Sequence, residues 1–331
     1  MYIYLKSVKE EKPGPKWKKL FEKYWPFYYK WFISEGLTNR PGYTTSRNKL
    51  KKHMPEILGL YDDLINLAGG SDIASRFLSM YNPPKYLSAC SQLVWKKEPL
   101  ALIRNYDYDL HKFEGALLYT NWLQPVIAVS DCIWGVLDGI NHSGLSISLA
   151  FGGRRIVGEG FGIPIILRYI LETCTNTQEA VEVLQRVPSH MAYNVTVLDA
   201  KGHYSTVYLS PDRSPVVTAL PYGTNHQILI DWEDYAAATY TRERQYFLER
   251  CLADSAKDLQ DIQSHFMEAP LFNTQYEKGF GTLYTSMYFP EEKSMQLLWP
   301  KKSMLQSFTN FEETRIAVNV SKYGSKGSLV K

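Results

Sequence analysis

The stretch from Ser88 to Asp109, SACSQLVWKKEPLALIRNYDYD, contains the residues with the clearest chemical potential. Two apolar runs flank a polar turn centred near Lys97, which predicts an antiparallel hairpin. Residues that face each other in such a hairpin have numbers that sum to about 194, so Cys90 is expected opposite Arg104. A guanidinium beside a thiol stabilises the thiolate, the nucleophilic form of cysteine. The pair therefore indicates either a nucleophile or a core cysteine beside a structural ion pair.

Asp107 follows Arg104 by three residues, so its side chain points to the opposite face of a regular strand. Both side chains would reach Cys90 only if a bulge or a bend interrupted that strand. A carboxylate beside the cysteine would be useful for holding a cation such as an ammonium group. If the chain were cut before Cys90, the new α-amino group, with an ordinary pKa of about 8, would serve as general base to its own thiol. No histidine would then be required.

The rest of the chain must provide the scaffold that positions this hairpin. Residues 55–70 and 71–81 have the apolar spacing and end signals of two helices. Apolar runs between 90 and about 150 predict antiparallel strands. Later elements are expected as helices at 163–174 and 177–186, a hairpin over 193–210, helical stretches near 234–253 and 257–267, and a hairpin over 281–300. This order predicts an α+β fold of stacked antiparallel sheets covered by helices.

Charge is unevenly distributed along the 331 residues. Residues 1–53 contain 13 Lys and Arg against 4 Asp and Glu, whereas the remainder contains 24 against 30. Such a basic, aromatic segment is able to bind an anionic membrane or nucleic acid. However, Trp17, Leu20, Phe21 and Tyr24 recur at helical spacing, which favours an apolar helix face that packs on the acidic body. We therefore expect no nucleic-acid partner.

No apolar core of a signal peptide follows Met1, and no apolar run reaches the about 18 residues of a membrane span. The sequence therefore predicts a cytoplasmic protein without an integral membrane segment. Cys132, Cys174 and Cys251 lie in apolar patterns and are expected in the core. The cysteines show no CxxC spacing, so neither a metal site nor a disulfide framework is predicted, and no cofactor is indicated.

Several segments, taken in order, resemble one known family. They are AGGSDIASRFLSMYNPPKYLSACSQ, RNYDYD, DGINHSGLSISL, GIPIILRYILETCTNTQEAVEVLQRVP, YNVTVLDAKG, YGTNHQ and GTLYTSMYF. Each pattern is loose by itself, but their order and spacing are specific and extend over most of the chain. The chain resembles the acyl-coenzyme A:isopenicillin N acyltransferase family of N-terminal nucleophile hydrolases, relatives of the choloylglycine hydrolases and penicillin V acylase.

The resemblance implies a four-layer αββα sandwich built by residues 90–331, preceded by a helical propeptide, the leader, over residues 1–89. It implies an inactive precursor that cuts its own backbone between Ala89 and Cys90, with the cut leader still bound. The mature thiol enzyme would hydrolyse linear amides or transfer the acyl group to an amine or a thioester. Leader aromatics would then either cap an apolar acyl pocket or form a docking face: Trp25, Phe27 and Tyr28.

The resemblance also implies roles for individual residues. Cys90 resembles the nucleophile, and its freed amine the base. Arg104 and Asp107 match an Arg-Asn-x-Asp signature, with Asp107 expected to hold the amine and Arg104 to act near the thiol. Asn141 and Asn194 match asparagines expected at the oxyanion or at the cysteine amine. Amide donors aimed at a developing oxyanion meet the main physical requirement of acyl transfer.

Arg242 falls about where the choloylglycine hydrolases carry an active-site arginine, with Arg244 as a close alternative. Asn225, in a similar Thr-Asn-His, is expected to support the site. From the residues alone, Asn141 and Asn225 also fit turn positions, and Arg242 fits a solvated helix charge. Many family members have glycine before the nucleophile, whereas this chain has Ala89; glycine more easily adopts the strained peptide geometry that an N-to-S acyl shift needs.

Two other functions remain open at this stage. One is a conventional Cys-His hydrolase that pairs Cys90 with His226 or His142 and leaves the chain uncut. The other is a catalytically silent binding module that uses its basic aromatic leader. Chain cleavage separates both from the self-processing amidase or acyltransferase.

Overall fold

The computed structural model describes residues 1–322 and contains two large β-sheets packed face to face. The nine-stranded sheet has the order β10-β9-β8-β7-β6-β5-β4-β1-β16. Its strands are β1 (Tyr2–Lys9), β4 (Ala116–Asn121), β5 (Pro125–Asp131), β6 (Gly135–Asn141), β7 (Ser146–Phe151), β8 (Tyr193–Leu198), β9 (Tyr204–Leu209), β10 (Val216–Thr218) and β16 (Arg315–Asn319). Neighbouring strands in this sheet are antiparallel, except for the parallel pair β1 and β4.

The second sheet has the order β11-β2-β3-β13-β14-β15 and is antiparallel in its described pairs. Its strands are β2 (Ala89–Trp95), β3 (Ala101–Tyr108), β11 (Tyr222–Gly223), β13 (Phe280–Phe289), β14 (Ser294–Trp299) and β15 (Lys302–Ser307), with β12 (Thr274–Gln275) paired to β13. Apolar side chains from both sheets meet in one core cluster between them, so the sheets form the two middle layers.

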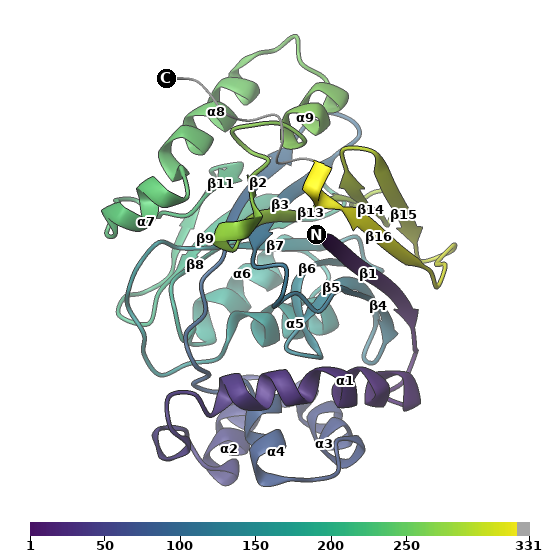
Figure 1. The fold of residues 1–331 in the computed structure, drawn as a ribbon, viewed down its shortest axis with the longest axis vertical. Helices are drawn as coiled ribbons and strands as arrows, with labels where there is room; N and C mark the ends of the chain where they lie inside the picture. The colour runs from purple at the N-terminus through teal and green to yellow at the C-terminus, as the bar shows by residue number, and fades with distance from the viewer. Residues whose placement is uncertain (323–331) are drawn as a thin grey trace.

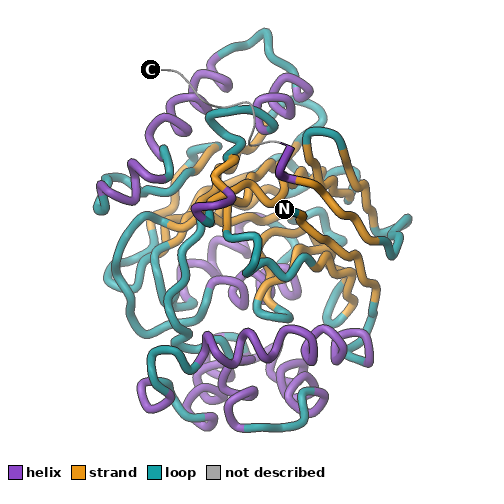
Figure 2. The backbone as a smooth tube through the Cα atoms, in the orientation of Figure 1, coloured by secondary structure: helices purple, strands orange, loops and turns teal. Residues whose placement is uncertain are grey.

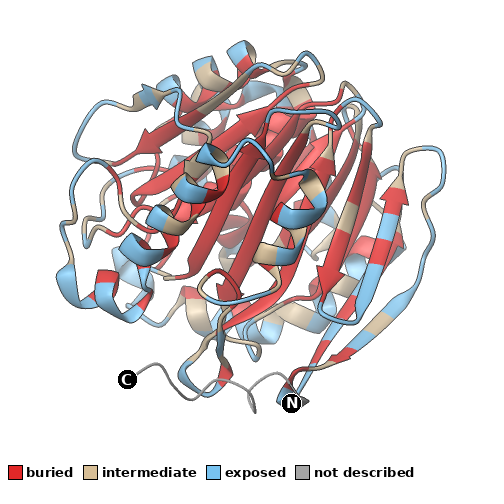
Figure 3. Cartoon of the chain, turned by 90° about the horizontal axis from the view of Figure 1, so that it is seen from above, coloured by how far each residue is buried: buried red, intermediate tan, exposed pale blue. Residues whose placement is uncertain are grey.

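Helices cover both outer faces of the pair of sheets (Figures 1 and 2). α7 (Glu233–Ala238), α8 (Thr241–Ala253) and α9 (Leu259–Phe266) lie over the sheet of β2 and β3. α5 (Ile163–Thr173) and α6 (Thr177–Arg186) lie under the nine-stranded sheet. The predicted four-layer αββα sandwich is thereby confirmed. Because central strands are covered on both faces, they are buried along their whole length, as the continuous red strands of Figure 3 show.

The leader supplies a further group of helices beyond α5. They are α1 (Pro15–Phe32), α2 (Tyr43–His53), α3 (Leu58–Leu67) and α4 (Asp72–Leu78). α1 buries Trp17, Phe21, Tyr28 and Phe32, which confirms that the basic aromatic segment forms a helix whose apolar face packs on its neighbours. The leader also contains β1, which the sequence reasoning missed. This strand lies inside the nine-stranded sheet, between β4 and β16.

The predicted hairpin forms β2 and β3, but its register differs from the one predicted. Cys90 pairs with Tyr106 and Gln92 pairs with Arg104, because the hairpin is centred at Glu98 rather than Lys97. A shift of two residues keeps every side chain on its predicted face. The helical stretch predicted over 234–253 is divided into α7 and α8 at Tyr240, which adopts a left-handed conformation with φ 51°. No helix among the described residues is long and apolar enough to span a membrane.

Candidate active site

Cys90 lies on β2 with its side chain on the face that packs against the nine-stranded sheet, and it is fully buried. Arg104 points to the same face, and its Nη2 donates a hydrogen bond to Cys90 Sγ at 3.2 Å. Ser88 Oγ is 4.0 Å from the sulfur. Burial raises the pKa of the Cys90 thiol, although the neighbouring Arg104 charge acts in the opposite direction. Burial therefore favours the neutral thiol over the thiolate at this position.

The guanidinium of Arg104 is held rigidly between the two sheets. Its Nε donates to Leu149 O at 2.8 Å, and its Nη1 donates to Tyr284 Oη at 3.1 Å and forms an ion pair with Asp138. Asp138 also accepts hydrogen bonds from Tyr284 and Tyr288. Because Asp138 balances the arginine, the sulfur receives a directed donor from a group whose charge is already compensated.

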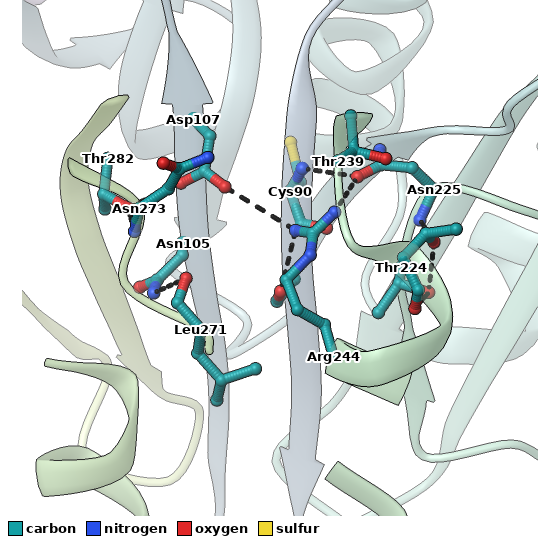
Figure 4. Close-up of polar contacts among 12 residues, drawn as sticks. Cys90, Asn105, Asp107, Thr224, Asn225, Thr239, Arg244, Leu271, Asn273 and Thr282 are labelled. Atoms are coloured by element: carbon teal, nitrogen blue, oxygen red, sulfur yellow. Dashed lines mark hydrogen bonds and ion pairs between the residues drawn. The ribbon is translucent and has the colours of Figure 1, made fainter. Parts of the chain in front are cut away.

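The backbone of Cys90 is held by groups from the helix side of the sheet (Figure 4). Its N–H donates to Asn225 Oδ1 at 2.9 Å, and its carbonyl accepts from Arg244 Nη1 at 2.8 Å. Arg244 Nη2 donates to the same Asn225 oxygen at 2.6 Å, and Nη1 donates to Ser91 Oγ at 3.0 Å. Arg244 is buried on α8, so Arg244 and Asn225 together fix the peptide on both sides of the Cys90 Cα.

Asp107 lies on the opposite face of β3 from the Cys90 sulfur, as a regular strand requires. The bulge or bend considered from the sequence does not occur between β2 and β3, and Asp107 pairs with Ala89, the residue before Cys90. Its Oδ1 accepts from Thr282 Oγ1 at 2.6 Å, and its Oδ2 is 3.6 Å from Arg244 Nη1. Burial raises the pKa of Asp107 to about 6, opposed by Arg244 and Thr282. Within residues 1–322, Asp107 Oδ2 has no hydrogen-bond donor.

Asn194 and Asn225 meet through one short loop. Asn194, on β8, donates from Nδ2 to the carbonyls of Thr224 and His226, each at 2.8 Å. These two residues flank Asn225, whose Nδ2 in turn donates to Phe151 O at 3.0 Å. Asn194 therefore positions the loop that presents Asn225 to Cys90.

The structure does not bring Asn141 to this cluster. Its Nδ2 donates to the carbonyls of Leu171 and Cys174, and its Oδ1 accepts from the backbone of Ser143 and Leu145. These bonds tie the β6–β7 turn to the end of α5, which is the turn role that the sequence left open for Asn141.

Arg242 also lies away from the cluster. It is exposed and pairs with Glu233 at 2.8 Å, whereas Arg244, two residues later, enters the site. Neither histidine considered from the sequence hydrogen-bonds Cys90: His226 Nδ1 bonds Thr241 Oγ1 at 2.9 Å, and the exposed His142 packs on Phe308. The geometry thus offers the thiol a guanidinium and no imidazole.

Sequence reasoning missed Tyr235, whose hydroxyl donates to Ser88 O. Tyr235 is buried on α7 between Phe151 and Trp232. No local pattern links it to Ser88, because 147 residues separate them along the chain. It nevertheless fixes the peptide that leads into the Ala89–Cys90 bond.

A cavity of about 710 Å³ opens where the leader meets the body. Leu87, Tyr86 and Lys85, just before the hairpin, line it together with the C-terminal half of α1. Its other apolar walls are Phe27, Tyr28, Trp31, Tyr108 and Phe280, and its cations are Lys30, Lys85, Lys112 and Lys278. Of the leader aromatics predicted to cap a pocket, Phe27 and Tyr28 line this cavity, whereas Trp25 stacks on Phe21.

The remaining cysteines, Cys132, Cys174 and Cys251, are buried, as expected of core residues. Among the described residues, no group of three or more His, Cys, Asp or Glu side chains is arranged to hold a metal ion.

A family model described as acyl-coenzyme A:6-aminopenicillanic acid acyl-transferase matches residues 95–304, a range that contains Arg104, Asp107 and Arg244 and begins just after Cys90. No curated protein matches.

This chain is similar to three solved structures at low sequence identity. A conjugated bile acid hydrolase mutant from Clostridium perfringens is 13% identical, with 70% of this chain and 97% of that chain covered and a TM-score of 0.47. Penicillin V acylase from Agrobacterium tumefaciens is 13% identical, with 66% and 86% covered and a TM-score of 0.43. An N-acylethanolamine-hydrolyzing acid amidase orthologue from Caenorhabditis elegans is 16% identical, with 61% and 93% covered and a TM-score of 0.43.

Proposed function

Because the chain belongs to the acyl-coenzyme A:6-aminopenicillanic acid acyl-transferase family, we propose that it is an amide hydrolase or acyltransferase that activates itself by cutting between Ala89 and Cys90. In self-cleavage, Cys90 Sγ attacks the carbonyl carbon of Ala89. The C–N bond breaks, a C–S bond forms, and the thiol proton passes to the new amine. Water then hydrolyses the thioester, which frees the thiol and leaves a carboxylate on Ala89.

One observation carries this proposal: near Cys90 there are more buried hydrogen-bond acceptors than the single N–H of its peptide can serve. The single N–H of the uncut peptide is used by Asn225, while the buried Asp107 Oδ2 lacks a donor. Arg244 Nη1 lies 3.6 Å from Asp107 Oδ2 and 2.8 Å from the Cys90 carbonyl oxygen, and Asp107 pairs with Ala89 across the hairpin. An ammonium group has three hydrogens, and it would supply the missing donor. A buried carboxylate oxygen that accepts no hydrogen bond is destabilising, and the ammonium group formed by cleavage would supply that bond.

In the mature enzyme, the free amine of Cys90 takes the thiol proton, and Sγ attacks the amide carbonyl of a substrate. The amine product leaves with that proton, and a thioester acyl-enzyme remains. Arg104, 3.2 Å from the sulfur, stabilises the thiolate at the start and at the end of the cycle. Water, an amine or a thiol then accepts the acyl group, so the substrates are small amides or acyl thioesters.

After cleavage, the leader stays bound. α1 contributes Trp17, Phe21, Tyr28 and Phe32 to a core cluster shared with the body, and β1 is hydrogen-bonded on both sides to body strands. Separation of the fragments would expose this apolar surface and both ladders, so we expect the fragments to co-purify.

Intact-protein mass spectra of the wild type and of Cys90→Ala test the proposal. The wild type should give fragments of about 10 and about 28 kDa in place of 38.1 kDa, in proportion to the 89 and 242 residues on either side of the cut. Cys90→Ala should remain whole and lack amidase activity. A wild type that stays whole would reject self-processing, and an active Cys90→Ala would reject the nucleophile.

A second candidate function, anion binding by an uncut chain, has one observation in its favour. A groove of about 1060 Å³ runs between α1 and β1. Its cations are Lys6, Lys16, Lys19, Lys23 and Arg315, and its aromatic walls include the exposed Tyr2 and Tyr4. Within the described part of the chain, Lys16 is the cation of this group that forms a salt bridge, with Glu313. Salt-sensitive binding of uncut Cys90→Ala to anionic vesicles or single-stranded DNA would support this function; its absence, in a protein whose wild type hydrolyses amides, would reject it.

A further inference from the structure

The peptide that precedes Cys90 occupies a defined, partly buried path. Ser88 and Ala89 are buried, with Ala89 fully enclosed at the start of β2. Tyr235 donates a hydrogen bond to the Ser88 carbonyl. Leu87 and Tyr86, further back, are half-buried and line the cavity beneath α1. The path therefore leads from Cys90, past the Tyr235 hydroxyl, to the cavity of aromatic and lysine side chains.

Self-cleavage and catalysis pass through the same type of covalent intermediate, a thioester on Cys90. In self-cleavage the acyl group on Sγ is the end of the leader, joined through the carbonyl carbon of Ala89. In catalysis the acyl group of a substrate is joined to the same sulfur through the same type of thioester. Cys90 Sγ and Arg104 are held in place between the sheets, so both acyl groups are attached at the same fixed position.

This inference rests on the proposed function. We propose that residues 86–89 leave this path after cleavage while α1 and β1 stay bound, and that the vacated path is the acyl-binding site of the mature enzyme and selects peptide-like acyl groups. Counted from the acyl carbonyl carbon, the second atom corresponds to the Ala89 Cα and the third to its nitrogen. The fourth atom corresponds to the Ser88 carbonyl carbon, whose oxygen receives the Tyr235 hydrogen bond.

The chemical class of the acyl group follows from this correspondence. The second atom carries at most a methyl group, because the Ala89 side chain is completely enclosed. The fourth atom carries an oxygen acceptor, because Tyr235 is buried and its hydroxyl would otherwise be left without the partner it now has. Beyond it, an apolar group reaches the wall of the cavity that Leu87 and Tyr86 line now. An N-acyl-alanyl or N-acyl-glycyl group meets these conditions, whereas a plain alkanoyl group lacks the acceptor.

Two fluorogenic probes whose acyl chains have the same length and the same methyl branch test the acceptor directly. They are the 7-amino-4-methylcoumarin amides of N-acetyl-alanine and of 2-methylpentanoic acid, which differ at the third and fourth atoms. The cleaved wild type should hydrolyse the N-acetyl-alanyl probe with a kcat/KM about tenfold higher, the effect of one buried hydrogen bond. Tyr235→Phe should reduce this ratio to about one. Tyr246→Phe, on the exposed side of α8, is the matched control and should keep the ratio.

Binding provides a readout that does not depend on turnover. The acid N-acetyl-Leu-Ser-Ala reproduces the end of the leader, and it should bind the cleaved wild type about tenfold more tightly than it binds cleaved Tyr235→Phe, as measured by calorimetry. If the Tyr235→Phe chain does not cleave, the comparison of the two probes on the wild type is sufficient to test the inference. Equal rates on both probes, or equal binding to both proteins, would overturn the inference.

The two levels of the proposal fail differently. A wild-type chain that remains uncut in the mass spectrum overturns the proposed function, and this inference with it. A cut chain that hydrolyses amides through Cys90 but does not favour the fourth-atom acceptor overturns this inference alone.

Discussion

Replacing Glu114 with glutamine should change how the stability of the chain depends on pH. Glu114 is buried where α1 meets the body, and its Oε1 accepts hydrogen bonds from Tyr28 Oη at 2.5 Å and from Ile133 N at 2.7 Å. Tyr28 Oη is also 2.9 Å from Asp131 Oδ1. One hydroxyl hydrogen cannot serve two carboxylates, so one carboxyl group must carry a proton for both contacts to persist.

Burial, followed by the charge of Asp131, raises the pKa of Glu114 from 4.5 to about 7. The folded chain therefore keeps this proton at pH values where the unfolded chain has lost it. The free energy of unfolding then falls as the pH rises from about 4.5 to about 7, and each pKa unit is worth about 1.4 kcal/mol. The fall attributable to Glu114 is about 3 kcal/mol, and Glu114→Gln should lack it.

Equilibrium urea unfolding at pH 5 and pH 8 measures this difference. The parent is Cys90→Ala, which remains one chain, and Glu114→Gln is introduced into it. Between the two pH values, the parent should lose about 3 kcal/mol more stability than the double variant. Exposed Glu22→Gln on α1 is the control and should behave as the parent. An equal loss in the parent and in the Glu114→Gln protein would refute the shared-proton reasoning.

Three further predictions concern the site itself. Arg244→Gln should slow self-cleavage and amide hydrolysis by about a hundredfold, because it removes charge-assisted bonds to Cys90 O and Asn225. Arg242→Gln, two residues away, is the control and should change neither rate when both are followed over time in samples quenched at intervals. Arg104→Leu should lower the free energy of unfolding by about 3 to 5 kcal/mol, because the buried Asp138 loses its cation; adding Asp138→Leu should restore part of it, and a double variant no more stable than the single one would contradict this. Asn141→Ala should lower the free energy of unfolding by about 2 to 3 kcal/mol and leave kcat of the folded protein normal. Asn194→Ala should slow self-cleavage, as followed by mass spectrometry. If Asn141→Ala slowed self-cleavage and Asn194→Ala did not, Asn141 would belong to the active site.

The sequence predicted most of the scaffold because that information is local. The apolar pattern of residues 163–174 and 177–186 gave α5 and α6 almost to the residue, and the polar KKEP turn gave the hairpin of β2 and β3. β1 was missed because its partners, β4 and β16, are distant in sequence, and its own lysines gave it the character of a charged terminus. Strand pairing of that kind is decided by tertiary packing.

The site residues show the same division. The sequence predicted that Cys90 and Arg104 share one face of the hairpin and that Asp107 lies on the other, and the structure agrees because a strand fixes which face each side chain occupies. The choice between Arg242 and Arg244 depended on the phase of α8, and that phase is reset at Tyr240, which no pattern in the surrounding sequence indicated. Asn141 and Asn194 both follow loose motifs; one anchors a turn and the other positions Asn225, and only the distant contacts of each side chain separate the two roles.

The place of β1 in the nine-stranded sheet makes residues 90–331 dependent on residues 1–89. β16, near the far end of the chain, pairs with β1 and not with β4, so the first strand bridges two strands of residues 90–331. A shortened gene beginning at Cys90 would leave β4 and β16 with bare edges, the kind of surface that recruits other chains into aggregates. Soluble recombinant enzyme should therefore require co-expression of residues 1–89 in cis or in trans, with the leader acting as a permanent structural subunit instead of a disposable one.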